Sequence, residues 1–157
     1  NATSTFKVIG SSQLTGDAGV SYKNTAGTEG KHEYPLRVTT ANTATPTELS
    51  IDDAGSIFLP ALADGDAYGI TAWITGRGTA GTNDDKTFYA KVSFLVKRVG
   101  STTSIPTSTV EYFVREVGTW DLAAGADDIN ERPAVKVTGD GATTINWAGY
   151  ATCTKVS

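Results

Sequence analysis

Residues 66–98 have the sequence DAYGITAWITGRGTAGTNDDKTFYAKVSFLVKR. Apolar side chains occupy every second position on both sides of a polar stretch: Tyr68, Ile70, Ala72 and Ile74 before it, and Phe88, Ala90, Val92, Phe94 and Val96 after it. Alternation over this length is typical of a β-strand rather than a helix. The polar stretch, residues 78–85, has no helical pattern. The sequence therefore predicts a long antiparallel hairpin at the centre of a half-buried sheet.

Length and composition narrow the class of protein. The chain has 157 residues, of which 39% are hydrophobic and 19% charged, and its net charge is -4. This suits a single globular domain. Lys and Arg are scattered, which argues against a nucleic-acid partner. No apolar run approaches transmembrane length, so no membrane partner is expected.

The rest of the chain continues the strand pattern. About nine to eleven short strands, separated by Gly, Pro and Asp turns, predict an all-β fold, an antiparallel β-sandwich of jelly-roll-like type. We expect this sandwich over residues 34–157. Residues 1–33 are weakly patterned and are expected to form an N-terminal extended arm, with a flexible linker as an equal alternative. Because the chain has no Met, Asn1 is not expected to be the start of translation.

Two finer predictions concern strands in the C-terminal half. Residues 110–116 carry apolar side chains on both faces, which predicts a central strand or one covered on both sides. Residues 133–138 and 144–156 are predicted as a hairpin. If Val135 and Ile145 share a face, a three-residue loop over residues 139–141 pairs them, with Gly141 in the left-handed conformation.

The order of these features resembles a known family. The order is residues 43–49 (TATPTEL), 57–60 (IFLP), the strands 68–77 and 88–98, residues 120–122 (WDL), and residues 135–147 (VKVTGDGATTINW). This is similar to the β-rich domain of bacteriophage tail-fibre and other virion surface proteins, which end in a Val-Thr-Gly … Ile-x-Trp-x-Ala pattern. The resemblance covers roughly residues 34–156. Gly149 and Tyr150 stand where the family more often has a small aliphatic pair.

The resemblance implies a function and partners. It implies a non-enzymatic structural protein on the surface of a phage particle, either a fibre domain or a capsid-decorating protein. Such a protein is expected to form a homotrimer, to contact other capsid or tail proteins, and to be located in the virion. The alternative is a carbohydrate-binding module that contributes to recognition of a host-surface glycan.

Four residues are the candidates for an interface or a binding site: Trp73, Tyr89, Leu95 and Tyr150. The first three lie at odd positions of the two central strands, opposite the apolar even face. Packing against another sheet or another subunit is the commoner fate of such residues. Stacking on sugar rings is the alternative, for Trp73, Tyr89 or Tyr150.

The sequence offers little for catalysis or metal binding. His32 is the single histidine and Cys153 the single cysteine, so no intrachain disulfide can form. We expect His32 to be solvated and Cys153 to be a buried core residue. The acidic clusters fall at predicted turns, where Asp is favoured for backbone reasons; they are residues 52–53, 64–66, 83–85 and 127–128. Calcium binding, best at residues 83–85, and a carboxylate-based glycosidase are the weaker alternatives. No catalytic residue, metal or cofactor is therefore predicted.

Overall fold

The structure is a computed structural model that describes residues 20–23, 30–52 and 54–156. The described residues form nine β-strands and no helix. The strands are β1 (Val20–Lys23), β2 (Gly30–Ala41), β3 (Thr47–Glu48), β4 (Ala67–Gly81), β5 (Thr87–Val99), β6 (Thr102–Arg115), β7 (Asp121–Asp127), β8 (Arg132–Thr138) and β9 (Thr143–Val156).

Six strands form one large antiparallel sheet in the order β1-β2-β9-β4-β5-β6. The predicted central hairpin is β4–β5, in which Ile70 pairs with Phe94 and Ala72 with Val92. The prediction is confirmed, with one difference: β4 continues to Gly81, so the turn is shorter than the polar stretch suggested. The alternating pattern thus places the even-numbered apolar residues of both strands on one face.

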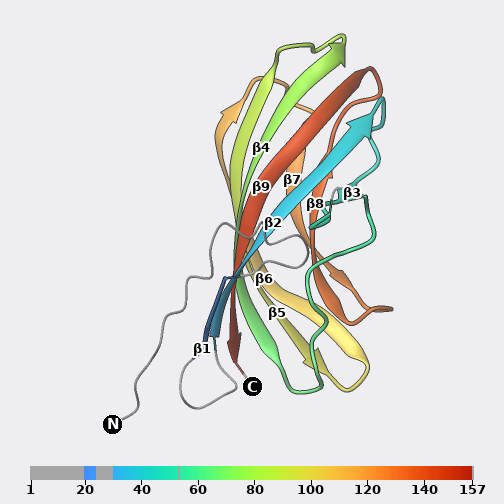
Figure 1. Cartoon of the computed structure of the whole chain (residues 1–157). Helices are drawn as coiled ribbons and strands as arrows, with labels where there is room; N and C mark the ends of the chain where they lie inside the picture. The colour runs from blue at the N-terminus through green and yellow to red at the C-terminus, as the bar shows by residue number, and fades with distance from the viewer. Residues whose placement is uncertain (1–19, 24–29, 53, 157) are drawn as a thin grey trace.

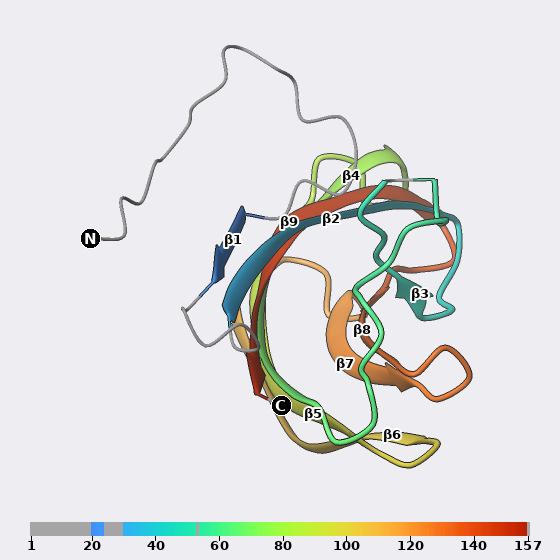
Figure 2. The same ribbon diagram turned by 60° about the horizontal axis from the view of Figure 1, so that its bottom comes forward.

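The remaining three strands form a small antiparallel sheet in the order β3-β8-β7, packed against one face of the large sheet (Figure 1). The large sheet curves around β7 and β8 (Figure 2), so its inner face is concave and its outer face convex. The all-β antiparallel sandwich is therefore confirmed. A jelly-roll arrangement is not confirmed, because the sheets of the described residues have six and three strands.

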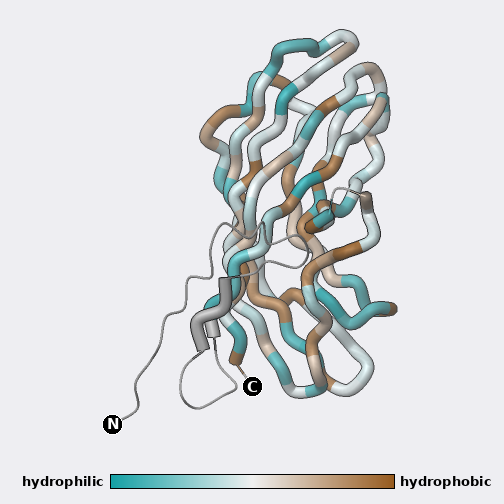
Figure 3. The backbone as a smooth tube through the Cα atoms, viewed as in Figure 1, coloured by the Kyte–Doolittle hydropathy of each residue, from teal (hydrophilic) through white to brown (hydrophobic). Residues whose placement is uncertain are grey.

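The core lies between the two sheets. Trp147 of β9 contacts Phe88 of β5 edge-on at 5.4 Å between ring centroids, and Trp120 packs on Trp147 at 5.7 Å. The indole N–H of Trp147 donates to the hydroxyl of Thr40 at 2.9 Å, so this buried polar group is satisfied. Hydrophobic and hydrophilic residues are interspersed along the strands (Figure 3), as expected when only one face of each sheet is buried.

The predicted hairpin of the last two strands is wrong. Strand β8 pairs with β3 and β7 in the small sheet, whereas β9 pairs with β2 and β4 in the large one. Val135 and Ile145 are both buried, but they face the same core from opposite sheets. The loop crosses between the sheets at Gly139, where an added Cβ would lie 2.9 Å from the Ile145 side chain. A burial pattern alone cannot distinguish neighbouring strands from strands that face each other.

The prediction that residues 110–116 form a central strand or one covered on both sides is also wrong. Residues 110–115 belong to β6, which is an edge strand of the large sheet, and Glu116 follows it. Phe113 and Val114 are exposed, and two register irregularities interrupt the pairing of β6 with β5. Bulges of this kind are common at edges, where they limit pairing with another chain.

Most of the predicted N-terminal arm, residues 1–33, lies outside the described residues. The described part, residues 20–23 and 30–33, belongs to β1 and β2 of the large sheet. Within the part of the chain that the structure describes, no helix is long and apolar enough to span a membrane.

Candidate functional site

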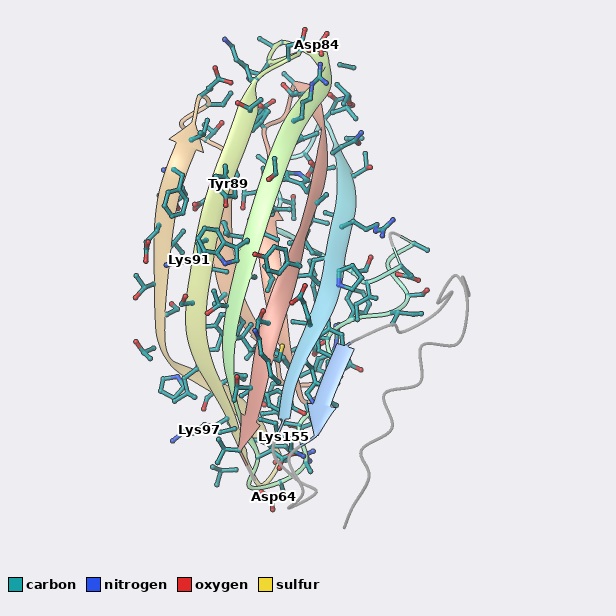
Figure 4. All side chains as sticks on the ribbon, turned by 60° about the vertical axis from the view of Figure 1, so that its left-hand side comes forward. Asp64, Asp84, Tyr89, Lys91, Lys97 and Lys155 are labelled. Carbon is teal, nitrogen blue, oxygen red and sulfur yellow. The ribbon has the colours of Figure 1, made fainter. Side chains whose placement is uncertain are left out.

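The outer face of the large sheet collects the odd-numbered side chains of β4 and β5. Trp73 pairs with Lys91 on β5 and with Tyr150 on β9, and Thr75 pairs with Tyr89. Since facing residues in a sheet project to the same side, these side chains lie together on the convex face. Figure 4 looks onto this face and shows Tyr89 and Lys91 projecting from β5.

Four aromatic residues form what we call the outer aromatic band: Trp73, Tyr89, Phe113 and Tyr150. The ring centroids are 5.8 Å apart for Trp73–Tyr89, 5.5 Å for Trp73–Phe113 and 5.3 Å for Tyr89–Phe113. These distances fit stacked aromatic packing, which restrains the rings. Trp73 is half-buried, and 37% of Tyr89, 42% of Tyr150 and 50% of Phe113 are exposed.

An ion pair lies beside this band. The Nζ of Lys91 is 2.7 Å from a carboxylate oxygen of Glu111 on β6. The same ammonium lies 5.4 Å from the ring centroid of Trp73, a distance that permits a cation–π interaction. The two charges of this part of the face therefore neutralise each other.

A row of hydroxyl side chains runs beside the band. Thr152, Thr71, Ser93 and Thr109 are successive register partners on β9, β4, β5 and β6. The hydroxyl oxygens of Thr71 and Ser93 are 3.3 Å apart. A shallow depression of about 510 Å³ covers this part of the face; its lining includes Thr71, Ser93, Leu95, Thr107, Thr109 and Thr154.

The structure places the four candidate residues on one face but not in one cluster. Trp73 and Tyr89 are in contact, and Tyr150 lies on the next strand opposite Trp73. Leu95 is 38% exposed and lines the depression. A second sheet over this face, one of the two expected covers, is absent from the described residues.

Phe113 belongs to the band although the sequence interpretation did not single it out. Its neighbour Tyr112 packs on the inner residue Phe88 at 5.9 Å, and the Tyr112 hydroxyl donates to Asp121. Burial, together with this hydrogen bond, raises the pKa of Tyr112. Tyr112 therefore points to the inner face of the sheet and Phe113 to the outer face. Apolar residues on both faces of β6 were the available signal, but they were interpreted as the mark of a central strand or of one covered on both sides.

His32 and Cys153 do not form a reactive pair. They are register partners on β2 and β9, and Cys153 is buried, as predicted. His32 is half-buried, with its ring 6.2 Å from that of Tyr34, so it is only partly solvated. Burial raises the pKa of the Cys153 thiol to about 12, so the group stays protonated near neutral pH.

The acidic clusters hold turns, as expected for Asp at such positions. Asp52 accepts hydrogen bonds from the backbone amides of Ser56 and Ile57, and the Ser56 hydroxyl lowers the pKa of Asp52 to about 2. Asp64 accepts from the amide of Gly100 at 2.6 Å, and Asp127 from the amide of Asn130 at 3.0 Å. Among the described residues, no three His, Cys, Asp or Glu side chains are grouped so that they could hold a metal ion.

Comparisons with known proteins include a weak structural likeness to a phage tailspike. No family model and no curated protein matches the chain. A crystal structure of the Acinetobacter baumannii phage AM24 tailspike protein is similar to it, with 13% sequence identity and a TM-score of 0.40. The match covers 79% of this chain but only 26% of the tailspike chain. A TM-score this low does not establish a common fold.

Proposed function

We propose that this chain is a non-enzymatic structural domain on the surface of a bacteriophage particle. The phage assignment rests on the ordered resemblance of residues 34–156 to virion surface domains. The observation that carries the surface role is the outer aromatic band, which the chain leaves exposed. An exposed patch of this kind is typical of a protein that works by contact with another molecule.

The non-enzymatic part of the proposal is supported by the use of the polar side chains. The carboxylates of Asp52, Asp64 and Asp127 accept hydrogen bonds that hold turns. Arg132 forms ion pairs with Glu48 at 2.6 Å and Asp127 at 2.9 Å, and its guanidinium lies 3.9 Å from the Phe58 ring centroid. The ion pairs join the three strands of the small sheet, and the ring contact connects this sheet to the loop between β3 and β4. They are explained by the fold without a substrate.

The proposal includes a homotrimer. Residues 1–19 precede β1, which is an edge strand of the large sheet. A segment attached at an edge can reach a neighbouring copy and pair or pack there. We therefore assign self-association to the N-terminal residues and the sheet edge of β1, with other capsid or tail proteins as further partners in the virion.

Light scattering on the purified chain tests the assembly. The full chain is expected to have about three times the 16.4 kDa mass of one copy. A chain that starts at Val20 keeps β1 and should lose the trimer or form it more weakly. A chelator should leave the mass unchanged. A full chain that stays monomeric, or a truncated chain that assembles equally well, would contradict this assignment.

A further inference from the structure

The outer aromatic band and the hydroxyl row lie side by side on one face. Tyr150, Trp73 and Lys91 are successive register partners in one row, and Thr152, Thr71 and Ser93 form the neighbouring row. Sugar rings have the matching chemistry, because they carry apolar C–H faces that pack on aromatic rings and hydroxyls that exchange hydrogen bonds. We infer that this face is a binding site for a neutral oligosaccharide, an activity beyond the structural role.

The size of the band fits a short carbohydrate chain. The band crosses four strands, from Tyr150 on β9 to Phe113 on β6. Three strand spacings of about 4.8 Å give a length of roughly 14 Å. The rings of Trp73, Tyr89 and Phe113 are held by mutual packing, so they lose little freedom when a ligand binds.

The ion pair beside Trp73 favours a neutral ligand. Lys91 is ion-paired with Glu111 at 2.7 Å. Its charge is therefore already neutralised and is not free to bind an acidic sugar. A carboxylated or sulfated ligand would also meet Glu111 itself. Binding of a neutral chain is expected to be insensitive to salt, because screening weakens interactions between charges only.

The shape of the face argues against a second copy as its occupant. The outer face is convex (Figure 2), so two copies would touch along a narrow strip. Stable obligate interfaces bury more than about 2,000 Å² in total. An interface here would also bury the hydroxyl of Thr109, which would need a partner, and the hydroxyls of Thr71 and Ser93, which among the described residues bond only to each other. A ligand that supplies hydroxyls of its own meets this need.

The test uses the full chain and immobilised oligosaccharides. The neutral probes are cellohexaose, maltohexaose, chitohexaose and a galactan hexamer, and the acidic probe is a hyaluronan hexamer. We expect at least one neutral probe to bind and to change tryptophan fluorescence in solution. We also expect the affinity to be the same in low and high salt.

Variants locate the site. Trp73→Ala and Tyr150→Ala should each weaken binding of the neutral probe by about tenfold. Thr71→Val keeps the shape of the side chain but removes a hydroxyl, and it should also weaken binding. Ile129→Ala is the control, because Ile129 is 92% exposed at the turn between β7 and β8, away from the band. Thermal midpoints near that of the unmodified chain verify folding.

Three results would overturn the inference. One is that none of the neutral probes binds the chain. Another is binding of the acidic probe alone, with loss of affinity in high salt. The third is a fall in mass by light scattering for folded Trp73→Ala and Tyr150→Ala while sugar binding stays unchanged, which would make the band a contact between copies.

Discussion

The carboxylate of Asp140 accepts a hydrogen bond from the indole N–H of the buried Trp120, with 2.7 Å between the oxygen and the nitrogen. The same carboxylate accepts from the side-chain amide of Asn83 at 3.1 Å and from the backbone amide of Ala142 at 2.9 Å. It therefore connects the β4–β5 turn, the start of β7 and the loop that crosses between the sheets.

Removing this acceptor should destabilise the fold. Asp140→Ala leaves the Trp120 N–H without its partner inside the core, which is expected to cost about 1–3 kcal/mol. Asp84→Ala is the control, because Asp84 is exposed at the tip of the β4–β5 turn (Figure 4), and it should change stability by less than about 0.5 kcal/mol. Chemical denaturation of both variants measures the difference. Equal unfolding free energies would show that Asp140 does not connect these elements.

The Asp140 carboxylate also makes the stability of the fold depend on pH. Burial raises the pKa of Asp140, but the hydrogen bonds from Trp120, Ala142, Thr143 and Asn83 outweigh it, so the folded-state pKa lies below the usual value. The contribution of this carboxylate is therefore complete above the unfolded-state pKa of about 3.9 and is lost as pH falls through the folded-state value. The stability difference between the unmodified chain and Asp140→Asn should be constant near neutral pH and shrink below about pH 4. A difference that grows on acidification would contradict this.

Two glycines of β4 give a matched pair of variants. A Cβ at Gly76 would lie 2.5 Å from the Trp147 ring, whereas a Cβ at Gly69 would meet nothing within 4 Å. Gly76→Ala should displace Trp147 and cost about 1–3 kcal/mol through overpacking. Gly69→Ala should be neutral or slightly stabilising. Thermal unfolding separates the two, and a Gly69→Ala variant as unstable as Gly76→Ala would indicate that the faces of β4 are misassigned.

Two residues on opposite faces of β5 give a second matched pair of variants. Phe94 is buried between the sheets, and Phe94→Ala should cost about 3–5 kcal/mol. Lys91 lies on the outer face in an ion pair with the exposed Glu111, so Lys91→Ala should cost about 1 kcal/mol or less. Urea denaturation is the measurement. Similar midpoints for both variants would mean that the inner and outer faces of the sheet are exchanged.

The thiol of Cys153 should be unreactive in the folded chain. Its pKa is raised to about 12 by burial, so little thiolate exists at mildly alkaline pH, and the sulfur is also out of reach of reagents. A thiol reagent should label the chain only when guanidinium unfolds it. Rapid labelling of the native chain would show that this end of β9 opens readily.

Local alternation was sufficient to predict the central hairpin. The even positions 68–74 of β4 and 88–96 of β5 carry apolar residues without interruption, and a shift of one residue would expose all of them. The assignment of Cys153 to the core followed from the same parity. Trp73, Tyr89 and Leu95 were likewise placed correctly on one face, because side-chain direction in a strand depends only on position.

Contacts between distant strands could not be predicted in this way. Val135 and Ile145 satisfy the same burial pattern whether they are neighbours in one sheet or face each other across the core. The apolar residues on the two faces of β6 lie in different environments. Tyr112 packs on Phe88 of the inner face, and Phe113 packs on Trp73 of the outer face. Asp140 was not singled out either, since its partners Asn83 and Trp120 lie far away in the sequence.

A reconstruction of an assembled phage particle that carries this chain tests the central claim most directly. We predict three copies around a threefold axis at the particle surface, with the N-terminal residues of each copy contacting a neighbour and the outer aromatic band facing solvent. A single unassociated copy, density inside the particle, or a band covered by another virion protein would contradict the proposed arrangement.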